Sequence, residues 1–389
     1  MAGGQRTLVG LGVGVAAASV ATALGVARGR AEHRRLALST LAPEGNYYEE
    51  PSEVVEVLAD DGVALHVEID LPPVDVDHSG ITVVLSHGFC LSLGSWVLQR
   101  RALAATGHRV VLWDQRSHGR SGLSPKAACD IDQLGRDLRA VIEGVVPEGP
   151  IALVGHSMGG MTMMALADQY PDLVKERVVA AAFVATSAGG AQLVSLGYGE
   201  LFGKLVSRVG PAVLDRLGAR QGLFNGLRGR ARELEEFLVG HYSFASPVPP
   251  EAIRFTADLL FATPLTVMSD FMATFDRHDK RHALEHFLGI EVLVLNGLQD
   301  VLTPPDHSAE IVRRVPGAEH VVIEDAGHII MLEHPDVVDE QLEALVERGM
   351  RAHAAGLAVE HKPRVRMLVM DMAKRRRVAK ARAAEARQK

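Results

Sequence analysis

The sequence predicts an α/β fold in which helices flank a mostly parallel sheet of eight strands, with a helical lid inserted after the sixth strand. Three observations support this prediction. Apolar runs typical of buried strands alternate with segments of helical periodicity. A strand, a sharp turn and a helix meet around Gly155–Gly159. A helical stretch of about 100 residues, rich in Leu, Phe and Met, separates two core strands and is read as the lid.

Each strand is predicted from a short run rich in Val, Ile or Leu. The first two strands form a hairpin, because Asp60-Asp61-Gly62 between them is a turn sequence. Helices separate most of the others, as in a parallel sheet. The predicted strands are Ser52–Leu58, Ala64–Asp70, Ile81–Ser86, Arg109–Asp114, Ile151–Gly155, Val178–Ala185, Glu291–Asn296 and His320–Ile323.

The helices between the strands have apolar residues at helical spacing. They are predicted at Ser95–Thr106, Asp130–Val145, Met158–Tyr170, Ser308–Val315 and Pro335–Gly349. The chain thus divides into five parts: an N-terminal hydrophobic anchor and linker (1–45), the first part of the core (46–186), the lid (187–288), the second part of the core (289–348) and a basic C-terminal tail (349–389). We expect the tail to be helical from Ala352 onward.

The N-terminal segment is apolar and uncharged from Leu8 to Val26, where 19 residues would span about 28 Å as a helix. We expect it to be a membrane anchor. Arginines follow it from Arg28 to Arg35, which predicts a cytoplasmic location for the body of the chain. Four glycines weaken it as a helix, so a cleaved signal peptide of a secreted protein and a soluble leader remain alternatives.

Composition restricts the class of protein. With 389 residues, 23% of them charged, the chain has the composition of a soluble globular protein. The two cysteines, Cys90 and Cys129, do not indicate a disulfide framework. The histidines form no metal-binding motif, so we expect no cofactor and no metal.

The sequence Gly155-His156-Ser157-Met158-Gly159 fits the G-x-S-x-G nucleophile elbow. Such an elbow holds its serine on a strained turn between a strand and a helix. Because the strand and helix approach each other closely there, small residues are needed at Gly155 and Gly159. We therefore predict Ser157 as a nucleophile. The alternative is a tight turn with a capping serine.

A serine nucleophile needs a base, and the base needs an orienting acid. His328 follows the last predicted strand and is the candidate base. Asp300 ends the preceding strand and is the candidate acid, because Asp325 lies too close in sequence to His328 to give it independent support. The run that begins at Asp114 is read as a scaffolding loop. The chain order is therefore serine, acid, histidine.

The developing oxyanion needs backbone N–H donors. Gly88 follows a predicted strand and permits a sharp turn that aims the next N–H inward. We assign the donors as the backbone N–H groups of Phe89 and Met158. His87, beside this turn, and His118 are read as structural residues.

These residues resemble the α/β-hydrolase fold superfamily, in its capped serine-hydrolase branch of esterases and lipases. The matching stretches are His87–Phe89, Asp114–Ser121, Gly155–Gly160, Asp300 and Gly327-His328, and the resemblance covers roughly Val54 to Leu345. It implies two-step acyl transfer through an acyl-enzyme on Ser157, and a lid that shapes substrate choice. Epoxide hydrolases and haloalkane dehalogenases of this fold carry aspartate at the elbow, so Ser157 argues against both.

The expected function is hydrolysis of a small-molecule or lipid ester. A serine-triad hydrolase or acyltransferase acting on an amide, lactone or thioester is the alternative, and a non-catalytic binding protein is another. The stretch from Lys362 to Lys389 contains eleven Lys or Arg residues and only two acidic residues. This excess of positive charge makes the tail a candidate for contact with anionic lipid headgroups of a membrane. Nucleic-acid binding is disfavoured, because no aromatic or groove-reading motif accompanies this charge. The oligomeric state is left open.

Overall fold

A computed structural model describes residues 47, 49–190, 232, 235–356, 366–372, 374 and 375. The predicted anchor, Leu8–Val26, lies outside these residues, as do residues 191–231 of the lid and most of the basic tail. Within the described ranges, no helix combines the length and the apolar character needed to cross a bilayer.

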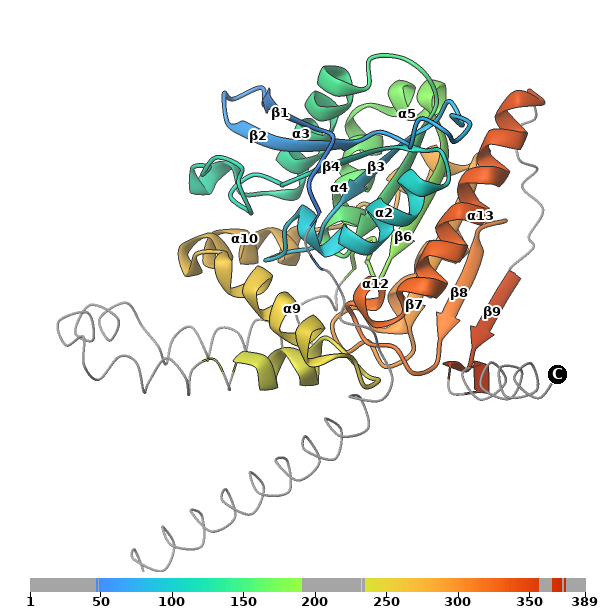
Figure 1. Ribbon diagram of the computed structural model, residues 1–389. Helices are drawn as coiled ribbons and strands as arrows, with labels where there is room; N and C mark the ends of the chain where they lie inside the picture. Colours follow the sequence, from blue (N-terminus) through green and yellow to red (C-terminus); the bar gives the residue numbers. More distant parts are fainter. Residues whose placement is uncertain are drawn as a thin grey trace, which may run out of the picture.

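In the described part of the chain, the sheet has nine strands in the order β1-β2-β4-β3-β5-β6-β7-β8-β9 (Figure 1). Only the pairs β1–β2 and β2–β4 are antiparallel. This confirms the predicted α/β fold, and the eight predicted strands all form. The strands are β1 Glu53–Leu58, β2 Ala64–Asp70, β3 Thr82–Ser86, β4 Arg109–Trp113, β5 Ile151–His156, β6 Val178–Val184, β7 Glu291–Gly297, β8 Glu319–Ile323 and β9 Arg366–Met370.

The ninth strand corrects the prediction of eight strands and of a helical tail from Ala352 onward. Strand β9 runs parallel to β8, with Glu319 opposite Arg366 and Ile323 opposite Met370. The short apolar run from Met367 to Met370 was overlooked because basic residues surround it in the sequence. This run can pair with the backbone N–H and C=O groups at the edge of β8. The preceding helix also continues to Ala354, past its predicted end at Gly349.

Helices cover both faces of the sheet (Figure 1). Helix α5 starts at Pro171, where the sequence predicted only the end of a helix, because proline is well tolerated in a first helical turn. The helices of the core are α2 Val97–Ala105, α3 Ile131–Val145, α4 Met158–Gln169, α5 Pro171–Arg177, α11 Pro305–Arg314, α12 Ile330–Glu333 and α13 Pro335–Ala354.

Alternation along each strand creates two hydrophobic cores, one on each face. In β3, Val83 and Leu85 join the core beneath α2 and α13, whereas Val84 joins the core beneath α3 and α4. Because helices cover both faces of the sheet, the central strands are buried along their whole length. This explains why their sequences are unbroken apolar runs.

The described part of the lid contains a helix at 235–242 and two further helices, α9 Pro250–Ala262 and α10 Leu265–Arg277. Its two ends meet: Gly189 forms a β-bridge with Asp279, and the Lys280 N–H donates to the Ala188 carbonyl at 2.8 Å. The lid therefore leaves the sheet after β6 and returns to it at nearly the same place.

The parallel strands all end at one edge of the sheet. Loops after β3, β5, β6, β7 and β8 consequently emerge side by side there. The residues predicted as functional lie on these loops: Gly88 and Phe89, Ser157, Asp300 and His328.

Candidate active site

Ser157 lies between β5 and α4 in a strained conformation. Its φ is 51° and its ψ is −115°, a region that non-glycine residues rarely adopt. A Cβ on Gly155 would lie 2.5 Å from the Gly159 carbonyl carbon, and a Cβ on Gly159 would overlap the Ser86 carbonyl. Only glycine fits at either position, so the strand and helix can close around the serine.

Backbone hydrogen bonds hold this turn. The Ser157 N–H donates to the Val184 carbonyl at 2.9 Å, and the Ser157 carbonyl accepts from Thr186 Oγ1 at 2.6 Å. Val184 is the last residue of β6, and Thr186 lies in the loop that follows it. The strain at Ser157 is therefore maintained by the neighbouring strand rather than by the turn alone.

His328 and Asp300 meet across the ends of β8 and β7. His328 Nδ1 lies 2.8 Å from Asp300 Oδ2, the Asp300 side chain is fully buried, and 6% of the His328 side chain is exposed. Because the carboxylate can only accept when ionised, it fixes the proton on Nδ1 and leaves Nε2 as the free lone pair. Among the described residues, nothing hydrogen bonds to Nε2.

Asp300 is held by several donors besides His328. The backbone N–H groups of Leu302 and Thr303 donate to Oδ1 at 2.8 and 2.9 Å, and Thr303 Oγ1 donates to Oδ2 at 2.8 Å. Burial alone would raise the pKa of Asp300. The electrostatic interaction with His328 and the hydrogen bonds from His328 and Thr303 outweigh burial and hold this pKa below its ordinary value.

His156 connects the elbow to the His328 loop. Its Nε2 donates to the His328 carbonyl at 3.0 Å, and the two rings lie 4.8 Å apart between centroids. Burial, reinforced by neighbouring His328, keeps the pKa of His156 well below its usual range, so the ring is neutral. His156 therefore supports the loop that carries His328, next to Ser157 in the chain.

The loop after β3 lies directly against the serine. A Cβ on Gly88 would be 3.2 Å from Ser157 Cβ and 2.6 Å from His156 Nδ1. In the described part of the chain, the backbone N–H groups of Phe89 and Met158 have no hydrogen-bond partner, and Ser157 Oγ has none either.

His87 and Gln115 hold this loop in place. The Gln115 N–H donates to His87 Nε2 at 2.9 Å, so the ring proton is on Nδ1 and donates to the Gly88 carbonyl at 2.8 Å. Gln115 Nε2 also donates to the His87 carbonyl. Burial lowers the pKa of His87 to about 4, which keeps the ring neutral at neutral pH.

Two other aspartates do not contact His328. Asp114 accepts the backbone N–H groups of Leu93 and Arg120 at 2.8 and 2.9 Å, so it organises the loops on either side of it. Asp325 contributes its carbonyl to His334 Nε2 at 3.0 Å.

Sequence reasoning missed two polar residues of this region. Thr303 donates to Asp300. Glu333, in α12, accepts a backbone N–H from the loop that carries His328. A hydroxyl three residues after the candidate acid could have signalled the first, whereas nothing local signals the second.

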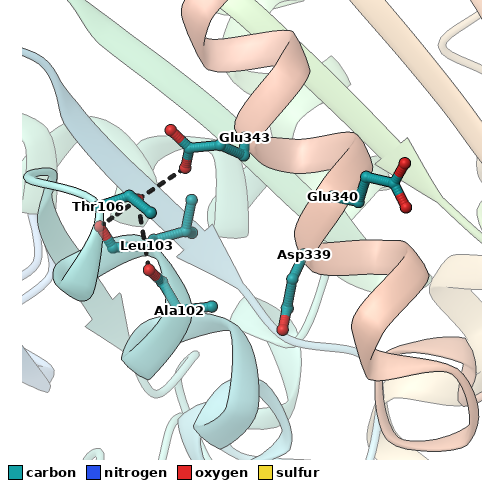
Figure 2. A pocket seen from close by; sticks show the side chains of 6 residues that line it. All are labelled: Ala102, Leu103, Thr106, Asp339, Glu340 and Glu343. Carbon is teal, nitrogen blue, oxygen red and sulfur yellow. Dashed lines mark hydrogen bonds between the residues drawn. The ribbon is translucent and has the colours of Figure 1, made fainter. Parts of the chain in front are cut away.

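A separate cavity of about 220 Å³ lies between α2 and α13 (Figure 2). None of the predicted site residues lines it. Its lining residues are Ala102, Leu103, Thr106, Asp339, Glu340 and Glu343. Across this cavity, Thr106 Oγ1 donates to Glu343 Oε2 at 2.7 Å (Figure 2), which ties the two helices together. Within the described ranges, no group of His, Cys, Asp or Glu side chains is arranged to hold a metal ion.

Residues 81–335 match the family model of the alpha/beta hydrolase fold. Among curated proteins, an sn-1-specific diacylglycerol lipase of Mus musculus is 30% identical over 276 residues, which cover 67% of this chain and 79% of the lipase. Among solved structures, an esterase of Thermogutta terrifontis superimposes with a TM-score of 0.57 at 22% identity, covering 77% of this chain and all of that one.

Other relatives match over less of their own length. The dihydrolipoyllysine-residue acetyltransferase component of the acetoin cleaving system of Pseudomonas putida is 27% identical over 275 residues, 69% of this chain and 64% of that protein. Epoxide hydrolase B of Mycobacterium tuberculosis is 38% identical over 122 residues, 31% of this chain and 33% of that enzyme.

Proposed function

The chain belongs to the α/β-hydrolase fold family, and on this premise we propose that it cleaves a carboxylic ester through an acyl-enzyme on Ser157. The observation that carries the proposal is the buried hydrogen bond between Asp300 and His328, which orients an imidazole at the sheet edge where Ser157 sits on its strained turn. Relatives named as esterases and lipases support the same class of reaction.

In the first step, Ser157 Oγ attacks the ester carbonyl carbon while His328 Nε2 removes the hydroxyl proton. Asp300 keeps the Nδ1 proton in place and stabilises the imidazolium that forms. The low pKa of Asp300 suits this role, since the carboxylate stays ionised at neutral pH.

The carbonyl oxygen becomes negative in the tetrahedral intermediate. The N–H groups of Phe89 and Met158, which have no partner within the described ranges, are assigned as its donors. Little reorganisation is needed to bring these donors to the oxyanion. His87 and Gln115 already fix the loop that carries Phe89, and the strained turn fixes Met158.

His328 then returns the proton to the alcohol oxygen, and the alcohol leaves. Water attacks the acyl-enzyme by the same route and releases the acid and Ser157. Each step needs only the residues already placed, so the proposed reaction requires no cofactor.

The substrate is proposed to be a lipophilic small-molecule or lipid ester. Phe89 packs against two aromatic residues of lid helix α10, with ring centroids 5.1 Å from Phe275 and 6.2 Å from Phe271. Apolar rings thus lie beside one of the proposed oxyanion donors, which favours an apolar group at that side of the reacting carbonyl.

The test is turnover of p-nitrophenyl esters from acetate to long acyl chains by the wild type and Ser157→Ala. We expect the variant to lose at least about 10³-fold in kcat/KM. Ser95→Ala is a matched control, because Ser95 is buried and its hydroxyl has no partner among the described residues. Equal rates for Ser157→Ala and Ser95→Ala would refute the serine mechanism.

A second candidate is acyl transfer from the same acyl-enzyme to an acceptor other than water. It is favoured by the similarity to the acetyltransferase component of Pseudomonas putida over 69% of this chain. Adding an alcohol or thiol to the same assay distinguishes the two. Transfer product that exceeds the acid product at low acceptor concentration would identify a transferase.

A further inference from the structure

Glu333 is a buried carboxylate that the proposed reaction does not use. It is the last residue of α12, five residues after His328, and only 5% of it is exposed. Within the described part of the chain, no Lys, Arg or His side chain forms an ion pair with it. Burial raises the pKa of Glu333 to about 7, against hydrogen bonds that favour its ionised form.

Those hydrogen bonds come from two segments that are distant in sequence. Glu333 Oε1 accepts the backbone N–H of Ala245 at 2.8 Å and that of Ser246. Glu333 Oε2 accepts the backbone N–H of Gly327 at 2.7 Å. One carboxylate thus binds the lid at residues 243–246, which we call the lid base, and also the residue that precedes His328.

The lid base contacts the His328 loop directly as well. The Ile329 N–H donates to the Ser243 carbonyl at 3.0 Å. A Cβ on Gly327 would lie 2.7 Å from that same carbonyl and 3.0 Å from the Ala245 nitrogen. His328 is consequently flanked by Ile329, which is hydrogen bonded to the lid base, and by Gly327, whose lack of a side chain allows the lid base to approach closely.

We propose that Glu333 is a positioning residue that couples the lid base to the imidazole of His328. This inference rests on the proposed function. The hydrogen bond from Asp300 fixes the direction of the ring, and His156 holds the His328 carbonyl. Glu333 holds the remaining side of the loop, so a displacement of the lid base moves the general base relative to Ser157.

Glu333→Gln tests this coupling by replacing one oxygen with an N–H donor at nearly constant volume. The amide oxygen can keep the hydrogen bonds from the Ala245 and Ser246 N–H groups. The NH₂ group then faces the Gly327 N–H, so that two donors oppose each other and this hydrogen bond is lost. We expect kcat for a short p-nitrophenyl ester to fall by about tenfold or more, with KM changed less than about threefold, because misplacing a catalytic group impairs the chemical step.

The matched control is Asp339→Asn, the same acid-to-amide change at a half-buried carboxyl of the adjacent helix α13, where Gln99 Nε2 donates to Asp339 Oδ1 at 2.9 Å. We expect its kcat to stay within about twofold of the wild type. Hydrogen exchange gives a readout independent of turnover. Peptides covering 243–246 and 325–330 should both exchange faster in Glu333→Gln and should be unchanged in Asp339→Asn.

The outcomes separate this inference from the proposed function. If Ser157→Ala retains activity, the proposed function fails, and the exchange data still decide the coupling. If Ser157→Ala is inactive but Glu333→Gln matches Asp339→Asn in kcat and exchange, the coupling is refuted. Should Glu333→Gln not fold, Glu333→Asp replaces it. Its shorter side chain cannot reach both segments, and wild-type kcat and exchange in that variant would refute the coupling.

Discussion

Thr303 and His328 share one oxygen atom: both lie 2.8 Å from Asp300 Oδ2, one through its hydroxyl and the other through Nδ1. From the residues that the structure describes, the other oxygen of Asp300 accepts only backbone N–H groups. The Thr303 hydroxyl is thus the one side-chain group, besides the imidazole, that the described residues place on this carboxylate. It fixes the position of Oδ2 and favours the ionised form.

Thr303→Val removes this hydroxyl and keeps the side-chain shape. The folded-state pKa of Asp300 should rise toward its ordinary value, because one hydrogen bond to the ionised form is lost. A lowered pKa contributes stability that is present above the unfolded value of 3.8 and is lost as the pH falls through the folded value. The acid unfolding midpoint should therefore move to higher pH, as measured by circular dichroism.

Thr303→Ser is the control, since it retains the hydroxyl. We expect kcat to fall by about tenfold in Thr303→Val, the effect of one lost hydrogen bond to a charged group, and by much less in Thr303→Ser. Identical acid unfolding and kcat in the two variants would show that the hydroxyl has no part in holding Asp300.

Gly88→Ala should impair the proposed oxyanion loop. The added Cβ would lie 2.6 Å from His156 Nδ1, closer than carbon and nitrogen can approach, so the loop or the ring must move. Displacing the neighbouring Phe89 N–H should reduce kcat by about 10²-fold, comparable with removing one oxyanion donor.

Gly240→Ala is the matched control for that substitution. A Cβ there would lie 3.6 Å from Ile253, an ordinary contact, within the helix at 235–242. Activity should be retained, and alanine should stabilise the helix by up to about 1 kcal/mol. Full activity of Gly88→Ala in a thermally stable protein would contradict the assignment of the Phe89 N–H.

Asp339, which lines the cavity of Figure 2, should make the stability of the protein depend on pH. Burial raises the pKa of Asp339 from 3.8 to about 6, against the opposing hydrogen bond from Gln99. A raised carboxyl pKa contributes stability below the unfolded value, and this contribution is lost as the pH rises through the folded value. The free energy of unfolding of the wild type, relative to Asp339→Asn, should therefore decrease between pH 4 and 7.

Urea unfolding of both proteins across this pH range measures the difference. The asparagine cannot ionise, so its own profile lacks this contribution. A difference that stays constant, or that increases with pH, would mean that the pKa of Asp339 is not raised in the folded protein.

Local sequence signals predicted most of the fold. Each of the eight predicted strands is an apolar run with turn residues beside it, and proline or glycine marks most of the helix ends. Strand β9 was not predicted, because its five residues lie among the basic residues of the tail. An edge strand also depends on the neighbouring strand with which it pairs. That neighbour is β8, more than 40 residues earlier in the chain.

The residues of the candidate site also divide into those with a local sequence signal and those that depend on distant partners. Ser157, Asp300 and His328 could be nominated from sequence, because each follows a predicted strand and parallel strands end at one edge. Glu333 could not be nominated, since its partners include Ala245 and Ser246, 87 or more residues away within the lid. Contacts made through backbone N–H groups leave no residue-type signal in the partner.

The bridge between Gly189 and Asp279 has a consequence for the evolution of the chain. Because the insertion begins and ends at neighbouring points, its length can change without altering the register of β6 against β7. Selection can therefore exchange the inserted segment while Ser157 and the sheet are inherited intact. The constraint on such exchange is local, since any replacement has to supply two backbone donors to Glu333.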